Sequence, residues 1–161
     1  IVETFRQIAP WLHRFELRPL ELYENKVRLN WREEFSPMLF GAHQMPDGAL
    51  RALALITLLL QPRENLPALI VIDEPELGLH PFALVVLASL VKEAAFHCQI
   101  LLATQSAYLL DQFDPEDLIV VDRRDGESIF RRLEPDELQE WLEDYTLSEL
   151  WEKNVIGGGP A

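Results

Sequence analysis

Two adjacent carboxylates follow a short apolar segment near the middle of the chain. The segment "LIVIDEPELGLHP" runs from Leu69 to Pro81, and Asp73 and Glu74 come directly after its four apolar residues. Burying a charged group is costly unless a metal, a hydrogen-bond network or a reaction uses it. Acidic side chains at the end of an apolar run therefore predict a chemical role.

These residue types suit phosphoryl transfer. An aspartate at the end of a strand can hold Mg²⁺, directly or through water, because Mg²⁺ prefers carboxylates and keeps several waters. A neighbouring glutamate can orient or deprotonate a water. Gln105 and Ser106 follow a second apolar segment, and the Gln105 amide could donate to a phosphate or position that water. A solvated acidic turn is the plainer alternative, but two polar groups behind neighbouring apolar runs favour the functional interpretation.

The elements that must position these residues alternate between helix and strand. Continuous apolar runs predict strands over 68–73, which we expect to be covered on both faces, and over 99–104 and 117–123. Asp47 is the expected N-cap of a helix over 49–60, and Pro81 opens a helix that ends near His97. The remaining predicted elements are a helix from Val2 to about Pro10, strands over 15–22 and 26–31 with a turn at 23–25, a strand over 128–133 that pairs with 117–123, and closing helices from Pro135 and Thr146.

This order predicts an α/β fold with a largely parallel central sheet flanked by helices. Ligands of such sheets lie outside the carboxyl ends of the strands. Asp73 and Glu74 end one predicted strand, and Gln105 and Ser106 follow the next. We therefore expect the two polar groups to leave the same edge of the sheet.

Composition limits the classes of function. The chain has 161 residues and a net charge of −13, which disfavours a broad nucleic-acid-binding face but leaves room for a local basic patch. The single Cys98 cannot form an internal disulfide, which indicates a reducing compartment, and we expect the cytoplasm. The most apolar run, 49–60, is too short to cross a bilayer, so no membrane partner is expected.

Three segments, in this order, resemble motifs of a known family. "LIVIDEPELGLHP" resembles the Walker B strand, catalytic glutamate and D-loop of the ABC-type ATPases, in the form used by the RecF/SMC-like branch. "MPDGALRALAL" (45–55) is similar to the signature motif of that branch, and "LLATQSAYLLDQF" (101–113) resembles its strand and switch region. The tail, 131–160, also resembles the end of bacterial predicted ATPases in this branch. The resemblance spans nearly the whole chain and implies a P-loop NTPase that uses ATP and Mg²⁺.

The resemblance implies roles at the acidic strand end and at the switch. Asp73 would bind the Mg²⁺ of Mg-ATP, and Glu74 would be the general base or the group that orients water. Gln105 would contact the γ-phosphate, with Ser106 beside it among the nucleotide-binding residues.

Further roles follow for a dimer interface. Gly78, Leu79 and His80 would form the D-loop, which in the family crosses that interface. Asp47 and Gly48 would face the ATP of a partner subunit, because a helix N-terminus offers free N–H groups and a positive dipole end to a phosphate. The resemblance thus implies a homodimer formed through the signature motif and the D-loop.

The chain departs from the family pattern in three ways. Pro46 stands where the signature serine is expected, and Gln105 stands where histidine is more familiar. The chain contains no G-x-x-x-x-G-K-[ST] loop, which the family places on an earlier strand. We therefore expect residues 1–161 to be the C-terminal part of one ATPase domain, with the N-terminal Walker A half of the same protein as its partner. Alone, the chain should bind ATP weakly or not at all and be inactive.

Three functions compete. The leading hypothesis is an ATPase whose two copies sandwich ATP, coupled to DNA repair, chromosome handling or phage defence, with any DNA contacted through other regions. A second is a nucleotide-dependent dimerisation module whose turnover is weakened. A third is a metal-dependent nuclease, which would need further carboxylates such as Asp122 and Asp125 at another strand end.

Overall fold

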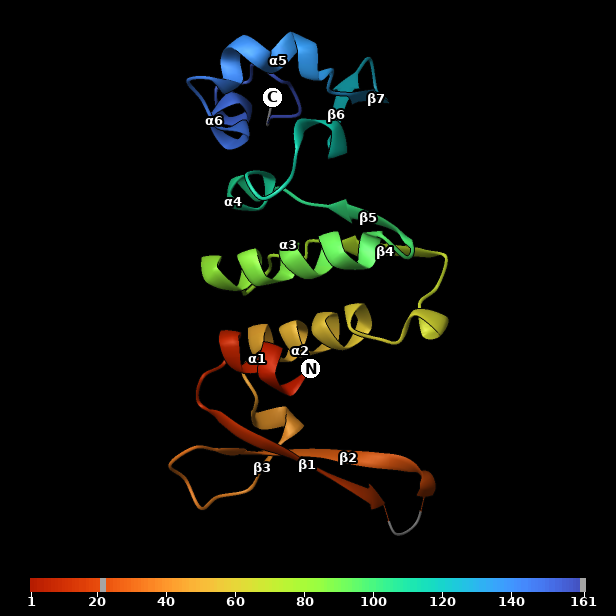
Figure 1. Ribbon diagram of the computed structural model, residues 1–161, viewed down its shortest axis with the longest axis vertical. Helices are drawn as coiled ribbons and strands as arrows, with labels where there is room; N and C mark the ends of the chain where they lie inside the picture. The colour runs from red at the N-terminus through yellow and green to blue at the C-terminus, as the bar shows by residue number, and fades with distance from the viewer. Residues whose placement is uncertain (21–22, 160–161) are drawn as a thin grey trace. The chain divides into compact units, whose positions relative to one another are not determined.

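The helices and strands of the chain belong to two units, each of which is described by itself. The computed structural model describes residues 1–20 and 23–159, and its units are Ile1–Ala103 and Thr104–Ala161 (Figure 1). The first unit contains α1 (Val2–Ile8), β1 (Leu12–Leu20), β2 (Tyr23–Glu33), β3 (Phe40–Gly41), α2 (Asp47–Leu59), β4 (Leu69–Asp73), α3 (Pro81–Ala95) and β5 (Gln99–Ala103), with short 3₁₀ helices at Ala42–Gln44 and Arg63–Asn65.

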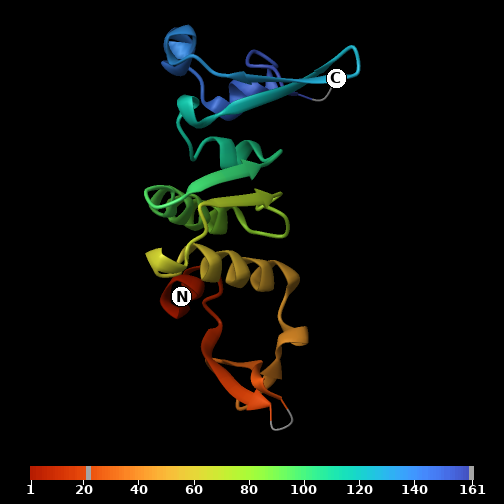
Figure 2. The same cartoon turned by 90° about the vertical axis from the view of Figure 1, so that its right-hand side faces the viewer.

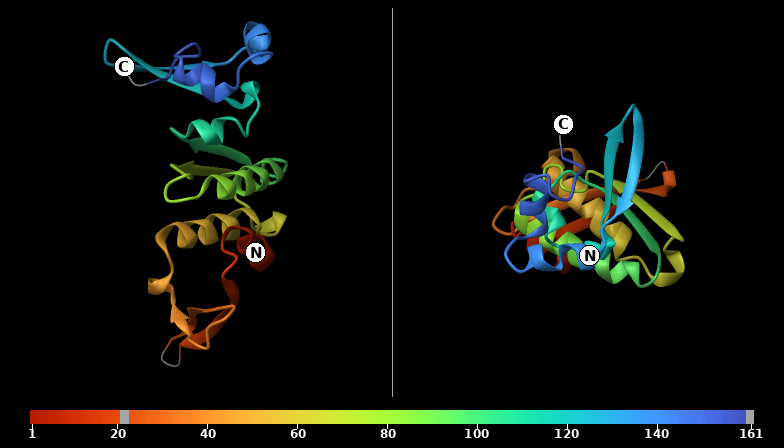
Figure 3. Two further views of the ribbon diagram at one scale, coloured as in Figure 1. Left: turned by 90° about the vertical axis from the view of Figure 1, so that its left-hand side faces the viewer. Right: turned by 90° about the horizontal axis from the view of Figure 1, so that it is seen from above.

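Strands β4 and β5 form a parallel pair in which Leu69 lies opposite Gln99 and Asp73 lies opposite Ala103. Helix α3 connects them and packs beside the pair (Figures 2 and 3). This is the strand–helix–strand unit predicted from the two apolar runs, and its bounds agree with the prediction within two residues. The carboxyl ends of both strands therefore lie next to each other, at Asp73 and Ala103.

One face of the β4–β5 pair is uncovered. Ile70 and Ile72 are buried, whereas Leu69, Val71 and Leu101 are 49%, 62% and 50% exposed. The prediction that β4 is covered on both faces is therefore wrong for this structure. A continuous apolar run indicates that both faces of a strand are normally buried. It does not indicate which polypeptide segment covers each face.

Helices α1, α2 and α3 pack on one another to form the core of the first unit. Their buried side chains include Phe5, Ile56, Leu59, Leu84 and Leu87. Spacing of three and four residues along α2 and α3 places these side chains on one face of each helix.

Strands β1, β2 and β3 form an antiparallel sheet. Trp31 anchors it, because the Trp31 ring stacks on Phe40 with centroids 4.6 Å apart and its indole N–H donates to the Gly41 carbonyl at 3.0 Å. The predicted turn at 23–25 is wrong, since Tyr23–Glu33 is one continuous strand. Glu21 and Leu22, the predicted end of the preceding strand, lie outside the described residues.

Helix α2 begins at Asp47, so Asp47 is not the N-cap. Pro46 occupies that position with φ −55° and ψ 139°, and no side chain caps the helix. The proline ring fixes the φ of Pro46 near the helical value. The ψ of Pro46 is extended and not helical, so Pro46 is the N-cap and not the first residue of the helix. Asp47 still lies in the first turn, where its charge is favourable to the helix dipole.

The second unit has its own core. Its elements are α4 (Ala107–Leu110), a 3₁₀ helix (Pro115–Asp117), β6 (Ile119–Arg124), β7 (Glu127–Arg132), α5 (Pro135–Leu142) and α6 (Leu147–Glu152). Strands β6 and β7 form the predicted hairpin, with Asp125 and Gly126 both at positive φ in the turn. The buried cluster consists of Val120, Leu133, Leu138, Leu147, Leu150 and Ile156.

The fold is mixed α/β, as predicted, but its parallel part consists of the β4–β5 pair alone among the described residues. The other two sheets are antiparallel. None of the described helices has the length and apolar character needed to cross a bilayer.

Candidate functional site

The carboxyl end of β4 presents Asp73 and Glu74 to solvent. The Glu74 N–H donates to the Ala103 carbonyl at 2.9 Å, which extends the β4–β5 ladder by one bond. Glu74 then turns the chain sharply with φ 46°, a left-handed conformation that costs a residue other than glycine about 1–2 kcal/mol. Strain of this kind at a strand end is typical of functional sites.

The loop after Glu74 is built from tight turns. The Leu77 N–H donates to the Glu74 carbonyl at 3.2 Å, and Gly78 has φ 77°, which glycine adopts without steric cost. His80 caps α3, since its Nδ1 accepts a hydrogen bond from the Phe82 N–H at 3.2 Å. The predicted opening of that helix at Pro81 is confirmed. The predicted D-loop residues therefore form an ordered connection between β4 and α3.

The start of α2 packs directly on this loop. A Cβ atom added to Gly48 would lie 2.0 Å from the Gly78 carbonyl oxygen, so only glycine fits at position 48. The Arg51 guanidinium, one turn further along α2, lies 3.5 Å from the Leu77 carbonyl oxygen. The structure therefore brings together Asp47, Gly48 and Gly78, which the sequence placed in two separate motifs.

Gln105 and Ser106 belong to the second unit. Ser106 is the N-cap of α4, where its Oγ accepts from the Leu109 N–H at 3.3 Å, and its own N–H donates to Thr104 Oγ1 at 3.0 Å. Gln105 is exposed. Their expected place beside Glu74 stays a prediction.

The acidic end of β4 offers carboxylate oxygens, which are ligands that Mg²⁺ accepts. Among residues 1–20 and 23–159 there is no group of three or more His, Cys, Asp or Glu side chains that could hold a metal ion. Asp73 and Glu74 are adjacent exposed carboxylates at the end of β4. Mg²⁺ needs only one or two carboxylates when waters and phosphate oxygens supply its other ligands.

The carboxylates considered for a nuclease have structural roles. Asp122 Oδ1 accepts from the Gly158 N–H at 2.7 Å, and Asp125 lies in the β6–β7 turn with φ 53°. Both positions are explained by local structure, as a hairpin setting predicts.

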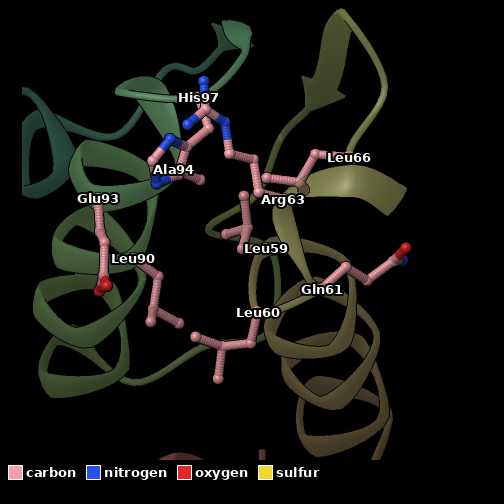
Figure 4. Close-up of a pocket in the computed structure, with 9 residues that line it drawn as sticks. All are labelled: Leu59, Leu60, Gln61, Arg63, Leu66, Leu90, Glu93, Ala94 and His97. Atoms are coloured by element: carbon pink, nitrogen blue, oxygen red, sulfur yellow. The ribbon is translucent and has the colours of Figure 1, made fainter.

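A shallow hollow of about 220 Å³ lies at the C-terminal ends of α2 and α3, away from Gly48 and Gly78 (Figure 4). The Arg63 side chain extends toward His97 across it (Figure 4). None of the predicted site residues lines this hollow; its lining is Leu59, Leu60, Gln61, Arg63, Leu66, Leu90, Glu93, Ala94 and His97.

Sequence reasoning missed the contact between Gly48 and Gly78 and the part played by Arg51. The two glycines are 30 positions apart, and no local pattern links them. The one available signal was a glycine in the first turn of a predicted helix, where alanine would be more stable.

The comparisons with known proteins agree with the motifs. Residues 39–111 match the family described as "AAA domain, putative AbiEii toxin, Type IV TA system". This stretch contains the start of α2, the end of β4 and the start of α4. No curated protein matches the sequence.

Solved structures of SMC proteins share the fold. One, from a study of ATP-driven dimerization and DNA-stimulated activation of SMC ATPases, aligns with a TM-score of 0.64 and 18% identity over 88% of this chain and 86% of the other. An Smc head bound to the C-terminal winged-helix domain of ScpA has a TM-score of 0.67 and 19% identity over 86% of this chain. An Smc head with an extended coiled coil from Pyrococcus furiosus, bound to the C-terminal domain of ScpA, has a TM-score of 0.64 and 18% identity over 88% of this chain.

This chain spans 42% and 35% of the last two structures. Identities of 18–19% show a common fold. The match over residues 39–111 and this fold together confirm the resemblance to the RecF/SMC-like branch of the ABC-type ATPases.

Proposed function

We propose that this chain is the C-terminal part of an ATPase domain that binds and hydrolyses Mg-ATP between two subunits. The observation that carries the proposal is the acidic end of β4, where Asp73 is exposed and Glu74 is held in a left-handed turn. The AAA-family match and the SMC-head fold support nucleotide binding.

Each side chain has a distinct task in this proposal. Asp73 would hold Mg²⁺, which would neutralise charge on the phosphate oxygens of ATP. Glu74 orients the attacking water and accepts its proton. Gln105 donates an amide N–H to the γ-phosphate, with Ser106 next to it at the start of α4.

In this proposal the dimer contacts come from the start of α2 and from the loop after Glu74. Asp47 and Gly48 present the uncapped start of α2 to the nucleotide of the partner subunit, where N–H groups attract phosphate. Gly78 and His80 form the segment that crosses the interface. The Gly48–Gly78 contact brings these two segments next to each other.

A second polypeptide segment must supply the phosphate loop, because G-x-x-x-x-G-K-[ST] does not occur in the sequence. The uncovered face of β4 and β5 supports this proposal, since parallel sheets occur almost only with both faces covered. Isothermal calorimetry on the 161-residue chain should show ATP binding that is weak or absent. A micromolar dissociation constant would contradict this proposal.

Hydrolysis is tested by phosphate release from this chain together with the polypeptide that carries its phosphate loop. Wild type should release phosphate with Mg-ATP, and Glu74→Gln should bind ATP without turnover. Loss of both binding and turnover in Glu74→Gln would contradict a purely catalytic role. We propose that this activity takes place in the cytoplasm. We also propose that it serves DNA repair, chromosome handling or phage defence.

One observation favours a second candidate, a nucleotide-dependent dimerisation module with weakened turnover. Pro46 occupies the N-cap of α2 and has no hydroxyl to offer a phosphate. Under this alternative, wild type and Glu74→Gln both bind ATP and dimerise, and neither releases phosphate.

A further inference from the structure

Arg51 lies where the start of α2 meets the loop after Glu74. It is the single basic residue of α2, and its side chain is exposed. Side chains of an α-helix tilt toward the N-terminus of the helix, so the Arg51 side chain is directed back toward the first turn. Its guanidinium Nη1 lies 3.5 Å from the carbonyl oxygen of Leu77, the residue before Gly78, and Gly78 contacts Gly48. A cation is therefore placed at the junction of the two segments that we propose as dimer surfaces.

The contact with Leu77 does not account for the charge of Arg51. Its distance exceeds the range of about 2.7–3.2 Å for ordinary N–H···O hydrogen bonds, so the interaction is weak. Asp47 lies four residues earlier, a spacing at which an aspartate and an arginine can pair. Within residues 1–20 and 23–159, however, Arg51 forms no ion pair with Asp47 or with any other residue. Most N–H donors of its guanidinium are therefore available to an acceptor that a second molecule supplies.

The start of α2 lacks the side-chain donor that the resemblance of its sequence implies. Pro46 stands where a serine is expected, and it has neither a hydroxyl nor an N–H group. No side chain caps the helix, and the negative charge of Asp47 in its first turn repels a phosphate. A guanidinium at this junction supplies the donor and the positive charge that Pro46 and Asp47 do not.

We propose that Arg51 donates hydrogen bonds to the γ-phosphate of the ATP bound by the partner subunit, in place of the missing hydroxyl. This inference rests on the function proposed above, because it requires ATP between two subunits. A planar guanidinium is always charged and binds phosphate oxygens through two parallel hydrogen bonds. Because its present contact is the weak one with Leu77, the guanidinium can turn to the phosphate without breaking an ion pair.

Dimerisation is the first readout, measured by light scattering on this chain together with the polypeptide that carries its phosphate loop. The Glu74→Gln background is used, because we expect it to bind ATP without turnover. Adding Arg51→Gln should raise the dissociation constant of the ATP-bound dimer by about tenfold or more, since charge-assisted hydrogen bonds are lost. It should leave the dissociation constant in ADP unchanged, because ADP has no γ-phosphate.

Phosphate release is the second readout. Arg51→Gln should lower it by about a hundredfold or more, as expected for an arginine that reaches a phosphoryl group from a second subunit. Arg51→Lys should keep part of the activity, because it keeps the charge but loses the paired hydrogen bonds. The matched control is Arg63→Gln, which removes the same charge from an exposed residue beyond the C-terminal end of α2 and should have no effect on either readout.

A mixture of Arg51→Gln and Glu74→Gln subunits tests whether the contact crosses the interface. In a mixed dimer, one of the two sites combines Glu74 of one subunit with Arg51 of the other, so the mixture should release phosphate faster than either variant alone. If Arg51 only supported the loop of its own subunit, the site that retains Glu74 would lack that support. The mixture would then be as inactive as its components.

Equal dimerisation and phosphate release with and without Arg51→Gln would overturn the inference and leave the proposed function standing. An inactive mixture, or an equal loss in Arg63→Gln, would overturn it as well. If wild type releases no phosphate and ATP does not favour its dimer, the proposed function fails and this inference fails with it. Circular dichroism checks that each variant is folded.

Discussion

The backbones of Gly48 and Gly78 are in direct contact, and a Cβ atom at position 48 would lie 2.0 Å from the Gly78 carbonyl oxygen. The contact joins the first turn of α2 to the loop that follows Glu74. Because the atoms that an added Cβ would meet belong to the backbone, no change of rotamer could relieve the clash. The contact lies between the two segments that we propose as dimer surfaces.

Gly48→Ala should destabilise the chain. Alanine is ordinarily more stable than glycine inside a helix by about 1 kcal/mol, but here the added methyl meets a carbonyl oxygen. We expect the free energy of unfolding to fall by about 1–3 kcal/mol, as for other overpacked sites. Urea unfolding followed by circular dichroism measures the change. Gly41→Ala is the control, because its Cβ would meet side-chain atoms of His43 and Gln44 and no backbone atom, and the close neighbour, His43, can turn away. A Gly48→Ala variant more stable than wild type would refute the contact.

Glu74→Gly should stabilise the chain and abolish turnover. Glycine adopts a φ of 46° without strain, which outweighs its larger loss of entropy on folding, for a net gain of up to about 1 kcal/mol. Glu74→Gln keeps the strain, so its melting temperature should equal that of wild type. Asp125→Gly relieves a similar φ of 53° in the β6–β7 turn, and it should raise the melting temperature without any effect on phosphate release. No gain from Glu74→Gly would show that the turn is unstrained.

The motifs of the site were predictable because their patterns are local. Continuous apolar runs identified β4 and β5, and proline at a first helical position identified the start of α3. The N-cap of α2 was assigned to Asp47 because aspartate is a common cap, but the preceding proline took that position. The prediction of a turn at 23–25 was wrong because a polar tripeptide within an exposed strand contains the same residue types as a turn.

Tertiary relationships were not predictable from the sequence. The Gly48–Gly78 contact depends on how α2 packs against the β4–α3 loop, and the spacing of residues in the sequence does not predict that packing. Likewise, alternation within β1 and within β2 places arginines on one face of each strand, but only their register sets Arg18 opposite Arg28. A one-residue slip in that register would remove the pairing.

Glu16 makes the stability of the chain depend on pH. Hydrogen bonds from Arg32 and Arg14 lower its pKa from 4.5 to about 2 in the folded state. Between these two pH values the unfolded state binds more protons, so folding stability rises with pH. The stabilisation from Glu16 is complete above about pH 4.5 and is lost as the pH falls through about 2.

Urea midpoints of wild type and Glu16→Gln should therefore differ near neutral pH and converge toward pH 2. The difference between the two proteins removes the contribution of the other carboxylates. A constant difference over this range would contradict the lowered pKa.

Asp111 should stabilise the second unit. Its carboxylate accepts from the Ser148 N–H at 2.8 Å and from the Ser148 hydroxyl at 2.7 Å, and these bonds hold α4 to α6. Asp111→Ala should lower the free energy of unfolding by about 1 kcal/mol, since the bonds are solvent-exposed. Ser148→Ala keeps the backbone bond and should cost less. Equal stability of all three proteins in urea would show that the link contributes nothing.

The uncovered face of β4 and β5 also bears on how the chain is handled in a cell. This face exposes the apolar side chains of Leu69, Val71 and Leu101, as an incompletely folded protein does. Chaperones and proteases act on such exposed apolar surface. We expect residues 1–161 produced alone to have a shorter half-life in cells than the same residues produced together with the segment that covers this face, and pulse-chase labelling would measure this. Quality control would then remove the uncovered form while the covered form persists.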